Sequence, residues 1–262
     1  MTHALQETKE DVLVFGSSRA RNHYVPEVFE KGLNTSFFNT GKDGSYVFYQ
    51  TAVLKAVLKR YRPKLIVYDF YGTLCYDQRD YDRLSVLLPY YKEHPEIRET
   101  LHLRGAYEPY KNVSRLYPFN STVAIVAKGL LLNDSATDQE KGYTPGKGAF
   151  KNVPNLEFRE PCPLDNQKVE HFKAFLSLCQ AEKVPLVVVF SPVIHDNSDD
   201  FMVQTIKEIC ERQNTDFYDF SKPEAFPKEK KYFVDDIHLN ESGSKLFSQK
   251  VVTLIKDKKL FE

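Results

Sequence analysis

The chain has 262 residues, of which 42% are hydrophobic, enough for one large core in one or two domains. Basic and acidic residues number 36 each, so the formal net charge is zero and the global basic footprint of a nucleic-acid-binding protein is absent. No run approaches the ~18 consecutive apolar residues of a membrane span, and the first residues lack the apolar core of a signal peptide. The chain as given is therefore predicted to be soluble, although a trimmed N-terminal anchor is compatible with a first strand that begins almost at once.

The four cysteines, at positions 75, 162, 179 and 210, form no Cys-x-x-Cys pair and no cluster with histidine. Neither structural zinc nor a thioredoxin-like motif is expected. Cys179 and Cys210 fall on apolar faces of predicted helices and are predicted to be small core residues. The set is compatible with a reducing or an oxidising compartment.

Short β-branched runs alternate with helical stripes along most of the chain. The first run, DVLVF, is closed by Gly16 and predicts a buried strand. The predicted strands cover residues 11–15, 36–39, 64–70, 185–190 and 216–220, and the predicted helices cover 45–61, 166–182, 199–212 and 241–256. This alternation predicts a parallel sheet with helices on both faces, in which ligands bind at the carboxyl ends of the strands.

Residues 71–160 break this rhythm. They contain predicted helices near 77–91, 94–103 and 122–132, many tyrosines, and a glycine-rich loop at 142–150. The segment is predicted to be a mostly helical insertion between the third and fourth strands, covering the strand ends as a cap within one domain of residues 1–262. Its tyrosines either stack on sugar rings or fill the core of the cap.

Two groups of polar residues stand where chemistry is expected. Ser17 and Ser18 follow the first predicted strand, and Asp235 precedes His238 by three residues just before the last helix. A carboxylate at that spacing on a turn can approach the imidazole Nδ1, fix the tautomer and support the imidazolium. Together these residues form a candidate triad in the order Ser, Asp, His.

These residues resemble the motifs of the GDSL/SGNH hydrolase superfamily. Its Gly-Asp-Ser first block is matched by Gly16-Ser17-Ser18, with serine in place of aspartate, and its Asn-x-Gly-x-x-Gly block by residues 39–44. Its Asp-x-x-His block is matched by Asp235 to His238. The resemblance spans the chain except residues 71–160 and implies a flavodoxin-like α/β/α sandwich with a central parallel five-stranded sheet.

The resemblance also implies roles for the matched residues. Ser18 is the implied nucleophile, His238 the base and Asp235 the orienting carboxylate. The backbone N–H groups of Ser18 and Gly44 are the implied oxyanion donors, each able to contribute roughly 3 kcal/mol to the transition state. Arg19 and Asn39 are candidate substrate-binding residues.

Each role has a structural alternative. The two serines could cap the following helix, the glycines of the second block could serve only as turn residues, and Arg19 could form an ordinary ion pair.

The third block of the family departs from this sequence. The family has an asparagine after the third strand as a further oxyanion donor, whereas this chain reads YDFYGTL over residues 68–74. An ionised Asp69 cannot donate, so Thr73 or a tyrosine would have to substitute. The Gly-Ser-Ser first block with a divergent third block is more similar to bacterial cell-envelope members of the superfamily, several of which handle O-acyl groups on polysaccharides.

The predicted function is hydrolysis of an ester, an acetyl or other short acyl group on a carbohydrate, through a Ser18 acyl-enzyme. The alternatives are an O-acyltransferase with the same triad, a lipid or thioester hydrolase, and a catalytically weak binding or scaffold module. Neither cofactor nor metal is predicted. The expected partner is a small-molecule or polysaccharide ester, with no nucleic acid, and the oligomeric state is left open. The compartment is the cell envelope by resemblance, or the cytoplasm.

Overall fold

The structure is a computed structural model of the 262-residue chain, and it describes residues 1–114, 116–119, 140–148, 150–151 and 161–261. Its centre is a sheet of five parallel strands in the order β2-β1-β3-β4-β5. The strands are β1 (Val12–Gly16), β2 (Phe37–Asn39), β3 (Leu65–Asp69), β4 (Leu186–Phe190) and β5 (Asp216–Asp219). The order reverses between β1 and β3, so the carboxyl ends of these two strands flank the switch point where open α/β sheets bind ligands.

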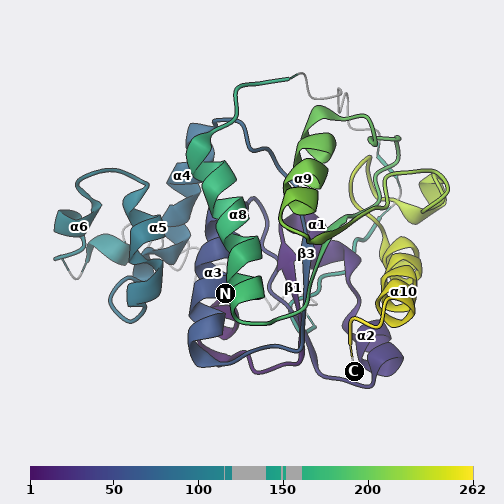
Figure 1. The fold of residues 1–262 in the computed structure, drawn as a ribbon, viewed down its shortest axis with the longest axis horizontal. Coiled ribbons are helices and arrows are strands. Elements are labelled where there is room, and N and C mark those ends of the chain that lie inside the picture. Colours follow the sequence, from purple (N-terminus) through teal and green to yellow (C-terminus); the bar gives the residue numbers. More distant parts are fainter. Residues whose placement is uncertain (115, 120–139, 149, 152–160, 262) are drawn as a thin grey trace.

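Helices cover both faces of the sheet (Figure 1). Those of the α/β framework are α1 (Ser18–His23), α2 (Pro26–Leu33), α3 (Val47–Arg60), α8 (Asn166–Ala181), α9 (Phe201–Arg212) and α10 (Glu241–Asp257). Shorter elements are η1 (His3–Glu7), α4 (Gln78–Asp82), η2 (Arg83–Tyr90), η3 (Pro95–Ile97), α5 (Arg98–His102), α6 (Glu108–Lys111), η4 (Tyr117–Phe119) and η5 (Lys230–Tyr232).

Alternating strand residues point into two separate cores. Leu13 and Phe15 of β1 pack with buried residues of α3, α8 and α9 on one face. Val12 and Val14 pack with buried residues of α1, α2 and α10 on the other face. The structure therefore confirms the predicted α/β/α sandwich around a central five-stranded parallel sheet.

The predicted strands and framework helices agree with the structure to within two residues at either end. The framework helices α1 and α2 are not among the predicted helices. The predicted helix at 77–91 is two elements, α4 and η2, because Pro89 lies inside the second one and disfavours a regular α-helix there. The predicted helix at 94–103 is likewise η3 followed by α5, and the one at 122–132 lies outside the described residues.

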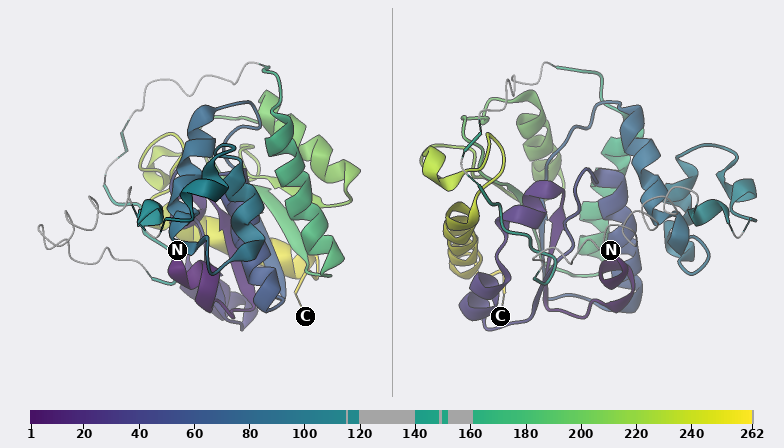
Figure 2. Two further views of the ribbon diagram at one scale, coloured as in Figure 1. Left: turned by 90° about the vertical axis from the view of Figure 1, so that its left-hand side faces the viewer. Right: turned by 180° about the vertical axis from the view of Figure 1, so that it is seen from behind.

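The first part of the long segment between β3 and α8 packs beside α3, whereas its residues 140–148 and 150–151 lie against α1, β2 and the loop before α10. Elements η2, η3 and α5 contact α3, and Figures 1 and 2 show α5 and α6 projecting from that side of the molecule. A disulfide joins Cys75 to Cys162, with 6.0 Å between the two Cα atoms, near the two ends of the segment. This pairing was not predicted from the sequence. Cys179 and Cys210 are free and buried, as predicted.

Within the described residues, no helix combines the length and the apolar character needed to cross a membrane.

Candidate active site

The structure brings Ser18, Asp235 and His238 together at the carboxyl edge of the sheet. Ser18 Oγ lies 2.9 Å from His238 Nε2, across 220 residues of sequence. His238 Nδ1 lies 2.9 Å and 3.0 Å from the two carboxylate oxygens of Asp235. A carboxylate only accepts, so Nδ1 carries the proton and Nε2 is left to accept one from the Ser18 hydroxyl.

A sharp turn after β1 presents Ser18. Gly16 ends the strand with a φ of +148°, and a Cβ at this position would lie 2.6 Å from the carbonyl oxygen of Asp69 on β3. Only glycine fits this close approach between neighbouring strands. Ser17 then occupies the N-cap position of α1 but makes no side-chain cap hydrogen bond. A purely capping role for the two serines is therefore not what the structure shows.

The loop before α10 holds the carboxylate of Asp235 in place. Its Oδ1 accepts hydrogen bonds from the backbone N–H groups of Ile237, at 2.9 Å, and His238, at 2.8 Å. Partial burial by itself raises the pKa of the Asp235 carboxyl, but the hydrogen bonds from the His238 ring and from these two N–H groups outweigh it. The net effect is a lowered pKa, so this carboxylate stays ionised beside the imidazole.

A buried polar network contacts this loop from the protein interior. His23 Nε2 accepts a 3.0 Å hydrogen bond from the backbone N–H of Leu239, next to His238, and His23 Nδ1 lies 3.0 Å from Ser191 Oγ. Arg19 donates to the same Ser191 hydroxyl at 2.9 Å and to its carbonyl oxygen at 2.7 Å. None of these three side chains is exposed to solvent.

Arg19 therefore forms an ion pair, the alternative to substrate binding. Its guanidinium is fully buried, forms an ion pair with Asp69 at 3.5 Å, and lies against the rings of Tyr71 and Phe190. A substrate at the molecular surface has no access to it. The sequence could not show this, because arginine is seldom fully buried.

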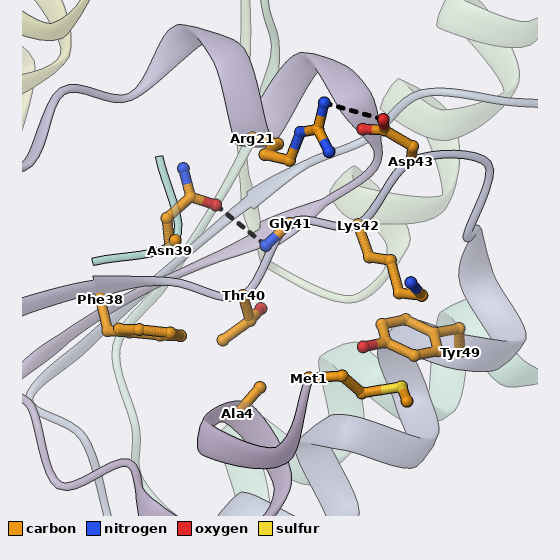
Figure 3. Close-up of a pocket in the computed structure, with 11 residues that line it drawn as sticks. Met1, Ala4, Arg21, Phe38, Asn39, Thr40, Gly41, Lys42, Asp43 and Tyr49 are labelled. Atoms are coloured by element: carbon orange, nitrogen blue, oxygen red, sulfur yellow. Dashed lines mark hydrogen bonds and ion pairs between the residues drawn. The ribbon is translucent and has the colours of Figure 1, made fainter. Parts of the chain in front are cut away.

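Asn39 also faces inward. Its amide nitrogen donates to the carbonyl oxygen of Ala20 at 2.7 Å, and its side-chain oxygen accepts from the N–H of Gly41 at 2.9 Å (Figure 3). With 1% of its surface exposed, it joins α1 to the loop of the second block.

The same loop borders a hollow of about 320 Å³, at whose rim Arg21 pairs with Asp43 at 2.9 Å.

Gly44 closes the second block in a left-handed conformation, with a φ of +61°. Within the part of the chain that the structure describes, its backbone N–H has no hydrogen-bond acceptor. The N–H of Ser18 opens α1, and the first N–H groups of a helix have no intrahelical acceptor. A Cβ at Gly44 would lie 3.5 Å from Cζ of Arg83, a neighbour that the sequence analysis did not identify.

The third block, residues 68–74, supplies no asparagine to the site, because its sequence contains none. Tyr71 and Thr73 stand in this segment and line a second hollow, of about 350 Å³. The Thr73 hydroxyl already accepts from the backbone N–H of Cys75, at 3.0 Å, and the ring of Tyr71 lies over Arg19. Both residues are at the expected edge of the sheet.

Two neighbours of the candidate site, His23 and Arg83, were not predicted from the sequence. Neither belongs to a motif, and each reaches the site only through the fold, so no sequence signal could have singled them out. The disulfide did leave a signal, because Cys75 and Cys162 lie at the two ends of the irregular segment.

No protein-family model matches the sequence, and no curated protein matches it. Solved structures of similar fold include a two-domain esterase active on acetylated mannans, 12% identical with a TM-score of 0.49, over 96% of this chain and 49% of that one. An acetyl xylan esterase is 12% identical with a TM-score of 0.46, over 93% and 99% of the two chains. A GDSL-like lipase from Bacteroides thetaiotaomicron is 12% identical with a TM-score of 0.43, over 95% and 87%.

At these identities the likeness extends to the fold alone. Fold and site define this chain as a parallel α/β protein that carries a hydrogen-bonded Ser-His-Asp arrangement at the switch point of its sheet. Such an arrangement can activate a hydroxyl as a nucleophile, because the base accepts its proton and the carboxylate stabilises the resulting imidazolium.

Proposed function

We propose that the chain is a serine ester hydrolase of GDSL/SGNH type, with Ser18 as nucleophile, His238 as general base and Asp235 as its orienting carboxylate. The observation that carries this proposal is the continuous line of hydrogen bonds from Ser18 Oγ through the His238 ring to Asp235, each close to 2.9 Å. These three side chains come from two regions more than 200 residues apart, so local sequence alone does not account for their alignment.

In the first half-reaction, Ser18 Oγ attacks the ester carbonyl carbon while its proton moves to His238 Nε2. A C–O bond forms, and the carbonyl π electrons move onto oxygen to give a tetrahedral oxyanion. Collapse of this intermediate breaks the bond to the alcohol oxygen, which takes the proton from Nε2 and leaves. The product at the protein is an acyl ester of Ser18.

Water completes the cycle by the same route in reverse order. His238 Nε2 takes a proton from water, the hydroxide oxygen bonds to the acyl carbon, and Ser18 recovers its proton as the carboxylic acid leaves. The N–H groups of Ser18 and Gly44 are the proposed donors to the oxyanion in both steps. No metal or cofactor takes part in this scheme.

The proposed substrate is an acetyl or other short acyl ester of a carbohydrate. Tyr46 and Tyr71 line the hollow beside the third block, and aromatic faces of this kind stack well on sugar rings. The Cys75–Cys162 disulfide supports location in an oxidising compartment such as the cell envelope, because disulfides persist there and are rare in a reducing cytosol.

The proposal is tested by labelling the purified protein with a fluorophosphonate probe and locating the adduct by mass spectrometry. We expect one adduct on Ser18, none in Ser18→Ala, and full labelling in Ser17→Ala, since the Ser17 side chain is buried away from the probe. Turnover of para-nitrophenyl acetate follows the same order. An unlabelled wild-type protein, or turnover that survives Ser18→Ala, contradicts the proposal.

A second candidate is a catalytically weak polysaccharide-binding module, favoured by the missing third-block asparagine. It predicts sugar binding without probe labelling. A third, acyl transfer to a sugar hydroxyl in place of water, predicts labelling together with an acylated sugar product. Mass analysis of products formed in the presence of acceptor sugars separates these candidates.

A further inference from the structure

The hollow beside the third block is built from two segments that meet at the carboxyl edge of the sheet. One is the loop after β3, with Tyr71 and Thr73, and the other is the start of α4 and η2, with Arg79 and Arg83. Tyr46, which precedes α3, completes its wall. Helix α4 is labelled beside α3 and α8 in Figure 1. The volume of about 350 Å³ suits a group the size of a sugar residue or a short acyl chain.

The hollow adjoins the candidate triad through two contacts. Arg19, directly after Ser18, lies 4.7 Å below the ring of Tyr71, which forms part of the wall. On the other side, Cζ of Arg83 lies 3.5 Å from the position that a Cβ would take at Gly44, the proposed oxyanion donor. The hollow therefore borders residues that contact Arg19 and Gly44, next to the proposed nucleophile and at the proposed oxyanion donor.

The carboxylates around the hollow are paired with other cations, so they compete only weakly with a ligand for the Arg83 guanidinium. Asp80, its ion-pair partner at 3.4 Å, lies 2.5 Å from the buried ammonium of Lys168 through its other oxygen. Asp77 pairs with Arg79 at 2.7 Å. Lys168 therefore balances the charge of Asp80, so that this carboxylate does not by itself neutralise the Arg83 guanidinium.

The Arg83 side chain is also open to solvent, with 43% of its surface exposed, whereas Lys168 is fully buried. Its guanidinium lies 5.4 Å from the ring centre of Tyr46, an arrangement that holds the planar group against the wall. A planar fork of five N–H donors beside an aromatic wall is suited to a carboxylate or a phosphate.

We propose that this hollow binds a negatively charged group of the ester substrate, a carboxylate or a phosphate, and that Arg83 is the residue that binds it. The inference rests on the proposed esterase function and adds a substrate class to it: esters of anionic sugars, or esters whose acyl part ends in a carboxylate. In this proposal Arg83 determines substrate specificity beside residues 68–74, the segment in which this chain departs from the family's third block.

The test compares matched esters that differ in one negative charge. On the acyl side, mono-para-nitrophenyl glutarate is paired with its methyl ester, and release of para-nitrophenol is followed. On the alcohol side, acetylated glucuronic acid is paired with its methyl ester, and an acetylated hexose phosphate with the acetylated hexose, and acetate release is followed. The second and third pairs distinguish carboxylate from phosphate.

We expect kcat/KM for the anionic member of at least one pair to exceed that for its neutral partner by about tenfold or more, and this ratio to fall toward one in Arg83→Met. Arg83→Lys, which keeps the charge but not the fork, should keep part of the preference. The exposed Arg212→Gln, on α9, serves as the matched control and should leave the ratio unchanged. In the wild type, the preference should also weaken as salt is added.

Three results overturn the inference. The first is a preference for the neutral ester in every pair, and the second is a preference for anionic esters that persists in Arg83→Met. The third is an equal decrease in kcat/KM for both members of a pair in an Arg83→Met protein whose melting temperature is that of the wild type. Each leaves the esterase proposal standing, because Ser18 labelling is independent of substrate charge. Absence of Ser18-dependent turnover of all the esters overturns both.

Discussion

His23 Nε2 accepts a hydrogen bond, 3.0 Å long, from the backbone N–H of Leu239, the residue that follows His238. A nitrogen that accepts carries no proton, so the ring of His23 is neutral and donates through Nδ1 to Ser191 Oγ. Burial, followed by the charge of Arg19 and by His238, holds the pKa of His23 well below its usual 6.5. A neutral buried imidazole thus fixes the peptide beside the proposed general base.

This arrangement predicts that acid weakens the fold through His23. The unfolded chain binds a proton at this ring near pH 6.5, while the folded chain does not, so the free energy of unfolding falls as pH decreases below that value. One such group accounts for about 2 kcal/mol between pH 7.5 and pH 5.0. We expect His23→Gln, which cannot titrate, to show a decrease smaller by about this amount.

Urea unfolding of both proteins at the two pH values measures the effect. Because the comparison is between two slopes, a loss of stability common to both pH values in the variant does not enter it. Equal pH dependence in His23→Gln and in the wild type would show that this ring titrates normally in the folded state.

Asp235→Asn should remove catalysis while the loop keeps its shape. Asparagine retains an oxygen that can accept from the N–H groups of Ile237 and His238, but it carries no charge to stabilise the imidazolium. We expect kcat for para-nitrophenyl acetate to fall by roughly 10³–10⁴-fold at neutral pH. Asp199→Asn, at an exposed loop position, is the matched control and should retain activity. A decrease of tenfold or less in Asp235→Asn would remove Asp235 from the proposed triad.

The fold and the residues of the candidate triad could be predicted because their sequence signals are local. The β-branched runs, the helical spacing of apolar residues, and the Asp-x-x-His turn each depend on neighbours within a few residues. Ser18 was predictable from its place at a strand end, and the parallel topology then puts it on the same edge as Asp235 and His238. The structure confirms the five-stranded parallel sheet, and it places Ser18 Oγ 2.9 Å from His238 Nε2.

The surroundings of the candidate triad could not be predicted, because they depend on contacts between distant segments. The burial of Arg19 requires Ser191, which is 172 residues away, and an arginine in a sequence gives no sign of such a partner. Asn39 sits in a recognisable motif, yet its inward orientation follows from the position of α1. The position of Arg83 depends on how α4 and η2 fold back beside Gly44.

Arg19→Met tests whether that arginine is structural. Removing the guanidinium leaves the buried Asp69 carboxylate without its cation, and uncompensated buried charges cost about 3–5 kcal/mol. We expect a loss of that size in the free energy of unfolding, measured with urea. The double variant Arg19→Met/Asp69→Asn should recover part of it, because the unpaired charge is gone. A stable Arg19→Met protein with a raised KM would instead point to substrate binding.

The disulfide should stabilise the protein and hold the wall of the hollow beside Arg83. Cys75 and Cys162 both line that hollow, and the bond closes a sequence separation of 87 residues. Bonds of this kind contribute about 2–4 kcal/mol by restricting the unfolded chain. We expect a lower melting temperature for Cys75→Ser/Cys162→Ser. Dithiothreitol should lower the melting temperature of the wild type but leave that of the double variant unchanged.

The double variant thus controls for other effects of dithiothreitol. Mass analysis after alkylation verifies that the disulfide has been reduced. If the melting temperature stays constant on full reduction, another contact must hold this segment. The buried ammonium of Lys168 is placed to do so, since it donates to the carbonyl oxygen of Cys75 at 2.7 Å. In that case Lys168→Met, rather than reduction, should lower the melting temperature and weaken the selection for anionic esters.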